Sequence, residues 1–235
     1  MDGVTRRRGA PTIRVVSLVP SVTETLCAWE RRPIACTRFC DQPALAHVGG
    51  TKDPRIDDIV TLRPDLVVVD AEENRREDYD ALVARGLDVH VLRIRSLADV
   101  GPAMASLAER VGARWTSPDL SSPVAHRLSA FVPIWRKPWM ALGTPTYGAS
   151  LLSHLGVATV FASQGPYPTT SLDDAIERHP DVVLAPSEPY PFTQRQLAEL
   201  SRVAPTLFID GRDLFWWGAR TEVALGRLAA VLHTL

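Results

Sequence analysis

One pattern of hydrophobic and polar positions occurs twice along the chain. Residues 57–72 read DDIVTLRPDLVVVDAE, and residues 173–188 read DDAIERHPDVVLAPSE. In both copies an Asp pair opens a short helical stretch, Pro-Asp follows, and an apolar run comes next. A proline directly after a helix ends it, and a short apolar run without alternation is typical of a parallel strand buried on both faces. The repeat therefore predicts two similar α/β lobes with a ligand-binding cleft between them.

The first predicted lobe, residues 13–96, alternates strands with helices. Strands are predicted at 13–19, 34–38, 66–70 and 88–92, and helices at 21–29, 56–62 and 73–85. Ser21 and Glu24 have the spacing of a capping box at the start of the first helix. Alternation of this kind predicts a parallel sheet with right-handed crossovers.

The second predicted lobe, residues 132–235, repeats this scheme. Strands are predicted at 139–142, 182–185 and 206–209, and helices at 147–155, 172–178, 194–202 and 221–233. The two lobes are joined by residues 97–131, which begin with an amphipathic helical pattern at 97–111. The segment TSPDLSSPVAH and a further helical turn at 125–130 follow it. Such a helical connector is expected to hold the lobes at a nearly fixed angle.

Composition and charge narrow the classes of partner. The 235 residues are 46% hydrophobic and 23% charged, with a net charge of −1. This balance gives no electrostatic case for binding nucleic acid or an acidic membrane surface. No stretch approaches the roughly 20 apolar residues of a membrane span, so the chain is not expected to cross a membrane. We expect a monomer.

The N-terminus MDGVTRRRGAPTIRVVSLVPS is basic and has no apolar run typical of a secretory signal before the first strand. The sequence as it stands therefore predicts a cytoplasmic protein. An extracytoplasmic location is expected instead if this N-terminus is that of a mature or truncated form.

The sequence shows no motif of an enzyme or a metal site. A nucleophile elbow, a phosphate loop, a dinucleotide fingerprint and a zinc-protease motif are all missing, and the six histidines are scattered. The three cysteines, Cys27, Cys36 and Cys40, indicate buried thiols of a reducing compartment and not a disulfide framework. Cys36 and Cys40 alone are too few ligands for a metal site. We expect a protein that is not an enzyme and has no intrinsic cofactor.

Aromatic and charged residues gather in the loops that follow the predicted strands. In open parallel sheets, ligands bind beyond the carboxyl ends of the strands. The expected ligand-binding residues are Phe39, Trp135, Tyr167, Tyr190, Phe192, Trp216 and Trp217, with Arg38, Arg75, Asp213 and Arg220 at the polar edges. Flat ring faces with a few charges suit a large, planar, partly polar ligand. The alternative is that about half of these aromatic side chains belong to the core.

Four segments resemble a known family. They are RVVSLVPSVTETL, GGTKDPRIDDIVTLRPDLVVV, SLDDAIERHPDVVLAPSEPYPF and DLFWWGARTEVAL. They are similar to the cobalamin-binding proteins of ABC importers, in the helical-backbone (class III) group of periplasmic substrate-binding proteins, which also includes iron-siderophore and haem binders. The resemblance covers about residues 13–232. It implies two Rossmann-like lobes joined by a long helix, with the ligand in the inter-lobe cleft. It also implies that Asp57 and Asp173 dock onto arginines of a membrane permease.

Three hypotheses about function follow. The first is a binding protein for cobalamin or a related corrinoid. The second is the same scaffold for a ferric siderophore or haem, whose carboxylates would meet Arg38, Arg75, Arg76 and Arg220. The third is an intracellular cofactor-handling protein or enzyme, with Glu72, Glu73, Asp41 and Asp213 as acid/base candidates.

Overall fold

The computed structural model describes residues 13–235 and divides them into two compact units. Unit 1 holds residues up to Leu92 and residues 107–114, and unit 2 holds residues 93–106 and 115–235. Helix α4 (Leu97–Val111) therefore contributes its first part to unit 2 and its last turn to unit 1. The basic N-terminal stretch discussed above lies largely outside the described residues.

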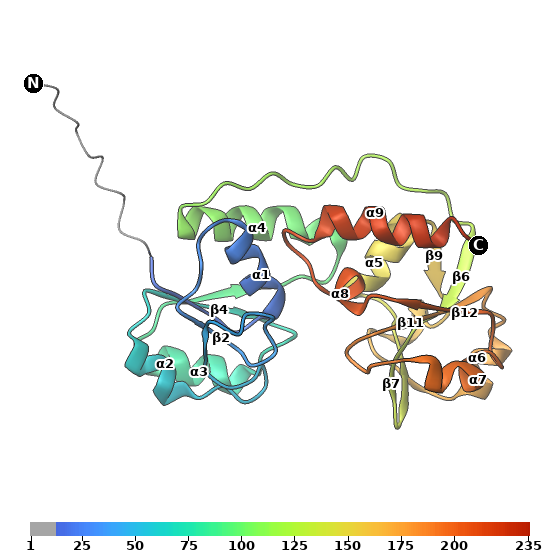
Figure 1. Cartoon of the computed structure of the whole chain (residues 1–235), viewed down its shortest axis with the longest axis horizontal. Helices are drawn as coiled ribbons and strands as arrows, with labels where there is room; N and C mark the ends of the chain where they lie inside the picture. Colours follow the sequence, from blue (N-terminus) through green and yellow to red (C-terminus); the bar gives the residue numbers. More distant parts are fainter. Residues whose placement is uncertain (1–12) are drawn as a thin grey trace, which may run out of the picture. The chain divides into compact units, whose positions relative to one another are not determined.

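Unit 1 is built on a five-stranded parallel sheet of order β3-β2-β1-β4-β5. Its strands are β1 (Val15–Ser17), β2 (Ala35–Cys36), β3 (Ala46–His47), β4 (Leu66–Asp70) and β5 (Val89–Leu92). Its own helices are α1 (Pro20–Ala28), α2 (Ile56–Leu62) and α3 (Arg76–Ala84). Figure 1 shows α2 and α3 on one side of this sheet and α1 on the other. Because both faces are covered, all five residues of β4 are buried, which explains its unbroken apolar sequence.

Unit 2 contains a four-stranded parallel sheet of order β12-β11-β6-β9 and a smaller antiparallel sheet of order β10-β8-β7. The strands are β6 (Leu128–Phe131), β7 (Pro133–Arg136), β8 (Trp139–Ala141), β9 (Val157–Thr159), β10 (Thr169–Thr170), β11 (Val182–Pro186) and β12 (Thr206–Ile209). The α-helices are α5 (Tyr147–His154), α6 (Leu172–Glu177), α7 (Leu197–Leu200), α8 (Gly211–Phe215) and α9 (Thr221–Leu232). Two 3₁₀ turns, η1 (Ala162–Gln164) and η2 (Gln194–Gln196), complete the unit.

The two copies of the repeat occupy the same position in their sheets. Strand β4 lies between β1 and β5, and β11 lies between β6 and β12. In each copy the preceding helix, α2 or α6, and the strand after Pro-Asp fall where the repeat predicts them. The topology therefore confirms an α/β fold with duplicated parallel sheets.

Four local expectations are wrong. Helix α1 begins at Pro20 with Val19 as its N-cap and has no side-chain cap, so the predicted capping box at Ser21 does not form. Proline suits this first helical position because its missing N–H is not needed there. The predicted helical turn at 125–130 is largely strand β6, and the segment at Trp139 is one strand of an antiparallel hairpin. Helix α8 lies where a loop was expected.

Candidate ligand-binding surfaces

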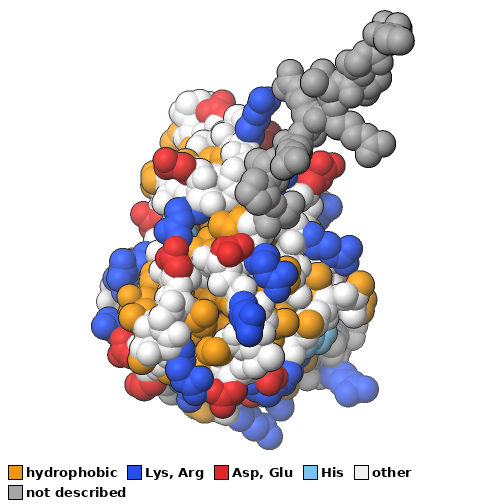
Figure 2. All heavy atoms as spheres, turned by 90° about the vertical axis from the view of Figure 1, so that its left-hand side faces the viewer, with side chains coloured by type: hydrophobic (Ala, Val, Ile, Leu, Met, Phe, Trp, Pro, Cys, Tyr) orange, Lys and Arg blue, Asp and Glu red, His pale blue; other side chains and the backbone are white. Residues whose placement is uncertain are grey.

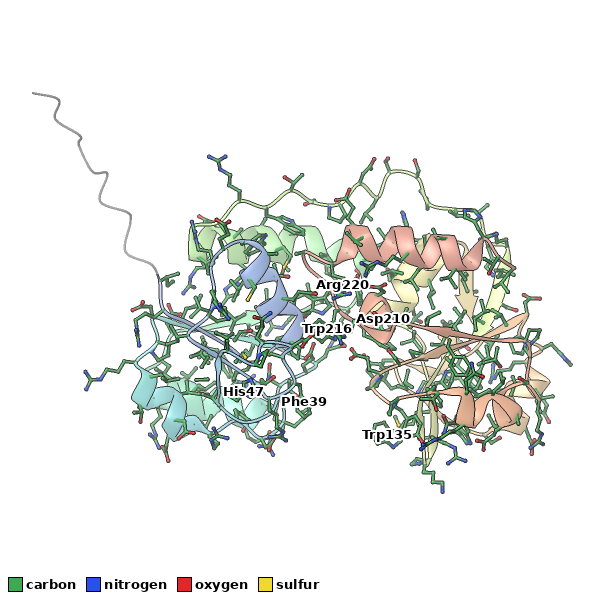
Figure 3. The ribbon with its side chains drawn as sticks, viewed as in Figure 1. Phe39, His47, Trp135, Asp210, Trp216 and Arg220 are labelled. Atoms are coloured by element: carbon green, nitrogen blue, oxygen red, sulfur yellow. The ribbon has the colours of Figure 1, made fainter. Side chains whose placement is uncertain are left out.

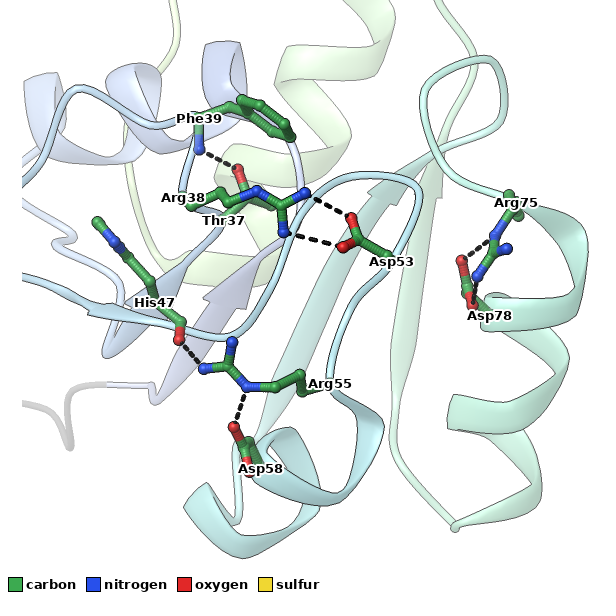
Figure 4. A network of polar contacts seen from close by, with 9 residues as sticks. All are labelled: Thr37, Arg38, Phe39, His47, Asp53, Arg55, Asp58, Arg75 and Asp78. Carbon is green, nitrogen blue, oxygen red and sulfur yellow. Dashed lines mark hydrogen bonds and ion pairs between the residues drawn. The ribbon is translucent and has the colours of Figure 1, made fainter.

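In unit 1 a paired arginine supports the exposed ring of Phe39. The guanidinium of Arg38 donates two hydrogen bonds to Asp53, at 2.9 and 3.0 Å, and lies 4.8 Å from the centre of the Phe39 ring. Figure 4 shows this pair beside the loop that follows β2. The hydrogen bonds from Arg38 lower the pKa of Asp53. Phe39 is 55% exposed, so its other face is available to a ligand.

The loop of residues 49–54 can approach Phe39 because Gly50 lacks a side chain. A Cβ at Gly50 would lie 2.9 Å from the Phe39 ring, 2.9 Å from Arg38 Nη2 and only 2.3 Å from Asp53 Oδ1. A larger residue would therefore require the Arg38, Asp53 and Phe39 side chains to move apart. The glycine therefore allows the Arg38–Asp53 pair and the ring to share one surface.

A third loop, after β4, is tied to the same surface through Asn74. This buried side chain donates to the carbonyls of Leu18 and Thr51, at 3.2 and 2.9 Å, and accepts from the backbone N–H of Asp70. Lys52 Nζ donates to the Glu72 carbonyl at 2.8 Å. Hydrogen bonds thus join three loops at the carboxyl ends of the strands, the edge at which parallel sheets bind ligands.

Arg75 lies on this loop and forms an ion pair with Asp78. It donates to both carboxylate oxygens of Asp78, at 2.9 and 3.0 Å. Its side chain remains 51% exposed, whereas that of Asp78 is 10% exposed. The expected polar edge is therefore an ion pair and not an isolated cation.

In unit 2 a buried carboxylate fixes Arg220 next to Trp216. Asp213 Oδ1 accepts hydrogen bonds from Arg220 Nη1 at 2.9 Å and from Arg227 Nη1 at 3.3 Å. Asp213 is only 3% exposed and serves as a buried counter-charge to these arginines, and its expected contact with a ligand stays a prediction. The half-buried Trp216 ring lies 5.5 Å from the Arg212 guanidinium and 5.7 Å from that of Arg220.

Glu188 also belongs to this group, although it is not among the predicted ligand-binding residues. The Trp216 side chain donates a hydrogen bond to its carboxylate. Gly211, at the start of α8, brings the chain so close that a Cβ there would lie 2.5 Å from Glu188 Cγ. The repeat is the sequence feature that could have drawn attention to Glu188, because Glu188 ends the second copy where Glu72 ends the first.

Burial raises the pKa of Glu188, and the Trp216 hydrogen bond and Arg212 offset this only in part. A raised folded-state pKa contributes stability that is complete below the unfolded value of about 4.3 and is lost as the pH rises through the folded value. We expect Glu188→Gln to remove this loss, so that the variant gains stability relative to the parent as the pH rises above the unfolded pKa of about 4.3. Urea unfolding across that range measures the difference. Parallel pH profiles for the two proteins would contradict it.

A second aromatic group of unit 2 lies on the β7–β8 hairpin and the loop after β11. Trp135, 43% exposed, meets Tyr190 edge-on at 5.7 Å, and Tyr190 contacts Phe192 at 4.7 Å. Phe192 stacks on Trp139 at 6.0 Å and is 3% exposed, so it is a core residue and not part of a binding surface. An open pocket of about 630 Å³ follows this group and is lined by Tyr190, Pro191, Thr193, Gln194, Arg195 and Gln196.

The structure brings some of the predicted residues together and separates others. Figure 3 shows Trp216 and Arg220 near Asp210 at α8, and Trp135 apart from them on its hairpin. Trp217 is 4% exposed, so its side chain is buried in this structure, and its expected contact with a ligand stays a prediction. Tyr167 is 42% exposed on the segment before β10. The exposed aromatic side chains thus form two groups within unit 2, and unit 1 carries Phe39.

Asp57 and Asp173 lie at matching positions of the two units. Each is the second residue of its helix, α2 or α6, and their side chains are 82% and 85% exposed. Each is paired with an arginine of its own unit: Asp57 with Arg85 at 2.5 Å, and Asp173 with Arg202 at 3.9 Å. The duplication thus extends to this surface feature.

Surface charge is mixed on the face of the molecule drawn in Figure 2, where basic and acidic side chains are interspersed. Over residues 13–235 no helix is long and apolar enough to cross a membrane. The same described residues hold no group of three or more His, Cys, Asp or Glu side chains that could bind a metal ion.

Parallel sheets bind ligands beyond the carboxyl ends of their strands, and in both units the loops at that edge carry aromatic side chains and ion pairs. No family model matches the chain. A vitamin B12-binding protein of Salmonella typhi is 24% identical over 194 residues, which cover 73% of this chain and 71% of the relative.

Solved structures share the fold. The periplasmic vitamin B12-binding protein BtuF of Vibrio cholerae gives a TM-score of 0.74 at 20% identity, covering 95% of this chain and 98% of that one. The periplasmic haem-binding protein HutB of Vibrio cholerae gives 0.76 at 18% identity, covering 94% and 99%. The relatives and the solved structures are named as vitamin B12-binding and haem-binding proteins, the group that the sequence segments resemble, and the solved structures show that this chain shares their fold.

Proposed function

We propose that the chain is the substrate-binding component of an ABC-type importer and that its ligand is cobalamin or a related corrinoid. The observation that carries the proposal is the half-buried Trp216 ring, which lies beside the guanidinium groups of Arg212 and Arg220, with Arg220 fixed by the buried Asp213 carboxylate. Phe39 offers a comparable ring over the Arg38–Asp53 pair in unit 1. Rigid ring faces bordered by polar groups suit a large macrocycle with amide side chains.

The pairing of the arginines favours a corrinoid over the alternative ligands. The four arginines expected to meet the carboxylates of haem or of a ferric siderophore each have an aspartate partner. The pairs are Arg38–Asp53, Arg75–Asp78, Arg76–Asp80 and Arg220–Asp213. The positive charges that would attract a carboxylate ligand are thus already compensated, whereas neutral amides can hydrogen-bond to the pairs as they stand.

The discriminating experiment is a set of titrations of the purified protein with cyanocobalamin, haemin and a ferric hydroxamate siderophore. Isothermal calorimetry gives the affinities, and absorption spectra report on the chromophores. We expect the tightest binding with cyanocobalamin. Tighter binding of haemin would assign the same scaffold to haem, and failure of all three would contradict the proposed ligand class.

Trp216→Ala is expected to weaken cyanocobalamin binding by about 1–3 kcal/mol, which is the range for a buried aromatic anchor. This corresponds to roughly a 5- to 150-fold rise in Kd. The matched control is Trp29→Ala, since Trp29 caps the carboxyl end of α1, the end remote from the ligand-binding loops. Equal affinities of Trp216→Ala and the parent, with both folded by circular dichroism, would make Trp216 purely structural.

A further inference from the structure

The loop between α8 and α9 carries both Trp216 and Arg220, and its second half is closed by Thr221. This buried threonine is the first residue of α9. Its hydroxyl accepts a hydrogen bond from the backbone N–H of Gly218 at 3.1 Å, and its own backbone N–H donates to the Gly218 carbonyl at 3.0 Å. Gly218 has a φ of 101°, in the left-handed region that favours glycine. These reciprocal bonds define the turn that contains Arg220.

Helix α5 supports the same turn from outside the loop. The hydroxyls of Tyr147 and Thr221 lie 3.3 Å apart, within hydrogen-bond distance, and both side chains are buried. Burial raises the pKa of Tyr147, the hydrogen bond with Thr221 offsets part of this rise, and the charge of Asp213 adds to it. The Tyr147 hydroxyl therefore stays protonated. At the next residue, Gly148, a Cβ would lie 3.1 Å from the Leu214 carbonyl oxygen, so α5 also packs closely on α8.

The side chains of Trp216 and Arg220 depend on this turn through the backbone. Trp216 ends α8, where its N–H donates to the Arg212 carbonyl at 2.9 Å, and Arg220 is the N-cap residue directly before Thr221. Asp213 holds the guanidinium of Arg220, but it does not fix the backbone from which that side chain starts. The hydrogen bonds of Thr221 do so.

We propose that Tyr147 and Thr221 are positioning residues that hold residues 216–220 in the conformation in which Trp216 and Arg220 contact the ligand. The inference rests on the proposed binding function, because both residues act through these two side chains. If the turn also populates other conformations, the apparent Kd rises by the inverse of the fraction that remains competent to bind. Hydrogen bonds between buried hydroxyls limit such alternatives, because an apolar contact has no comparable directionality.

The first test removes the hydroxyl of Thr221 and keeps the approximate shape of the side chain. Thr221→Val is expected to raise the Kd for cyanocobalamin roughly 3- to 10-fold, as follows when about a third to a tenth of the molecules keep the competent turn. Tyr147→Phe should change affinity in the same direction, and Thr221→Ser, which retains the hydroxyl, should bind as the parent does. The matched control is Thr159→Val, because Thr159 is also buried and its hydroxyl has no hydrogen-bond partner within residues 13–235.

A double-mutant cycle separates positioning from a general loss of stability. In the Trp216→Ala background one of the two positioned side chains is missing, so Thr221→Val should raise the Kd by clearly less than it does in the parent. Equal fold-changes in the two backgrounds would overturn the proposal. So would unchanged affinity in both Thr221→Val and Tyr147→Phe, or equal weakening by Thr221→Ser and Thr221→Val. Circular dichroism checks that each variant is folded.

Backbone hydrogen exchange without ligand keeps this test separate from the assignment of the ligand. Tyr147→Phe leaves the acceptor of the Gly218 N–H in place, so a change in exchange reports the lost support from α5. Peptides that cover residues 216–221 should exchange faster than in the parent, and peptides of α1 should not change. If the parent fails to bind cyanocobalamin, the proposed ligand is wrong, whereas the positioning of the loop is overturned only by unchanged exchange at 216–221.

Discussion

Asp213→Ala is expected to lower the free energy of unfolding by about 3–5 kcal/mol, the range for removing one partner of a buried ion pair. Asp213 is 3% exposed and accepts hydrogen bonds from Arg220 and Arg227. The Arg220 side chain is itself only 14% exposed, so without the carboxylate its charge would be left almost buried. Urea unfolding at constant pH and salt measures the change.

The control for this prediction is Asp80→Ala, which removes a different kind of ion pair. Asp80 accepts from Arg76 on the surface of α3, where the two side chains are 56% and 77% exposed. Exposed pairs of this kind contribute about 0–1 kcal/mol because water and salt screen them. A similar small effect in both variants would show that Arg220 finds water or another partner, and that Asp213 is not essential to the Trp216 support.

The parts of the fold that were predicted correctly are those in which local sequence and burial agree. Helix α2, strand β4 and strand β12 have the predicted bounds. In β4 every residue is buried, so an unbroken apolar run can be interpreted without knowledge of its neighbours. The repeat also predicted the position of β11 in its sheet, because two segments with the same sequence pattern are expected to occupy equivalent positions.

The parts that were missed depend on contacts between distant segments. The strand at Trp139 has the same composition in a parallel or an antiparallel sheet, and its pairing with β7 decides which forms. Helix α8 has only five residues, too few to show a helical period, and begins at the Asp210 cap.

The candidate site was predicted less well than the fold, for the same reason. The sequence predicts which residues lie in loops that follow strands, and Phe39, Trp216 and Arg220 were selected on that ground. The burial of the loop side chains could not be predicted from the sequence in this way. Phe192 is covered by Tyr190 and Trp139, and Asp213 by arginines of the following segment, through folding of the loops themselves.

Asp57→Ala and Asp173→Ala are each expected to abolish ligand uptake by cells while leaving the affinity of the purified protein unchanged. The prediction rests on the proposed importer function, in which both carboxylates meet arginines of a permease. A carboxylate in a desolvated, bidentate pair with arginine costs about 2–5 kcal/mol to remove. Docking must first release Asp57 from Arg85 and Asp173 from Arg202, which is a small cost because both aspartates are more than four-fifths exposed.

Asp58→Ala and Glu177→Ala are the matched controls, because these acidic residues lie on the same two helices, are exposed, and are not at the duplicated docking position. Uptake of radiolabelled cyanocobalamin should persist in both. Cell fractionation belongs in the same experiment, since a binding protein that serves a permease must meet it on the side from which the ligand arrives. Uptake unchanged in Asp57→Ala and Asp173→Ala, or protein found only in the cytosol, would contradict the docking role. Corrinoid binding by the purified chain would then stand without transport, because the Trp216 and Phe39 surfaces involve neither aspartate.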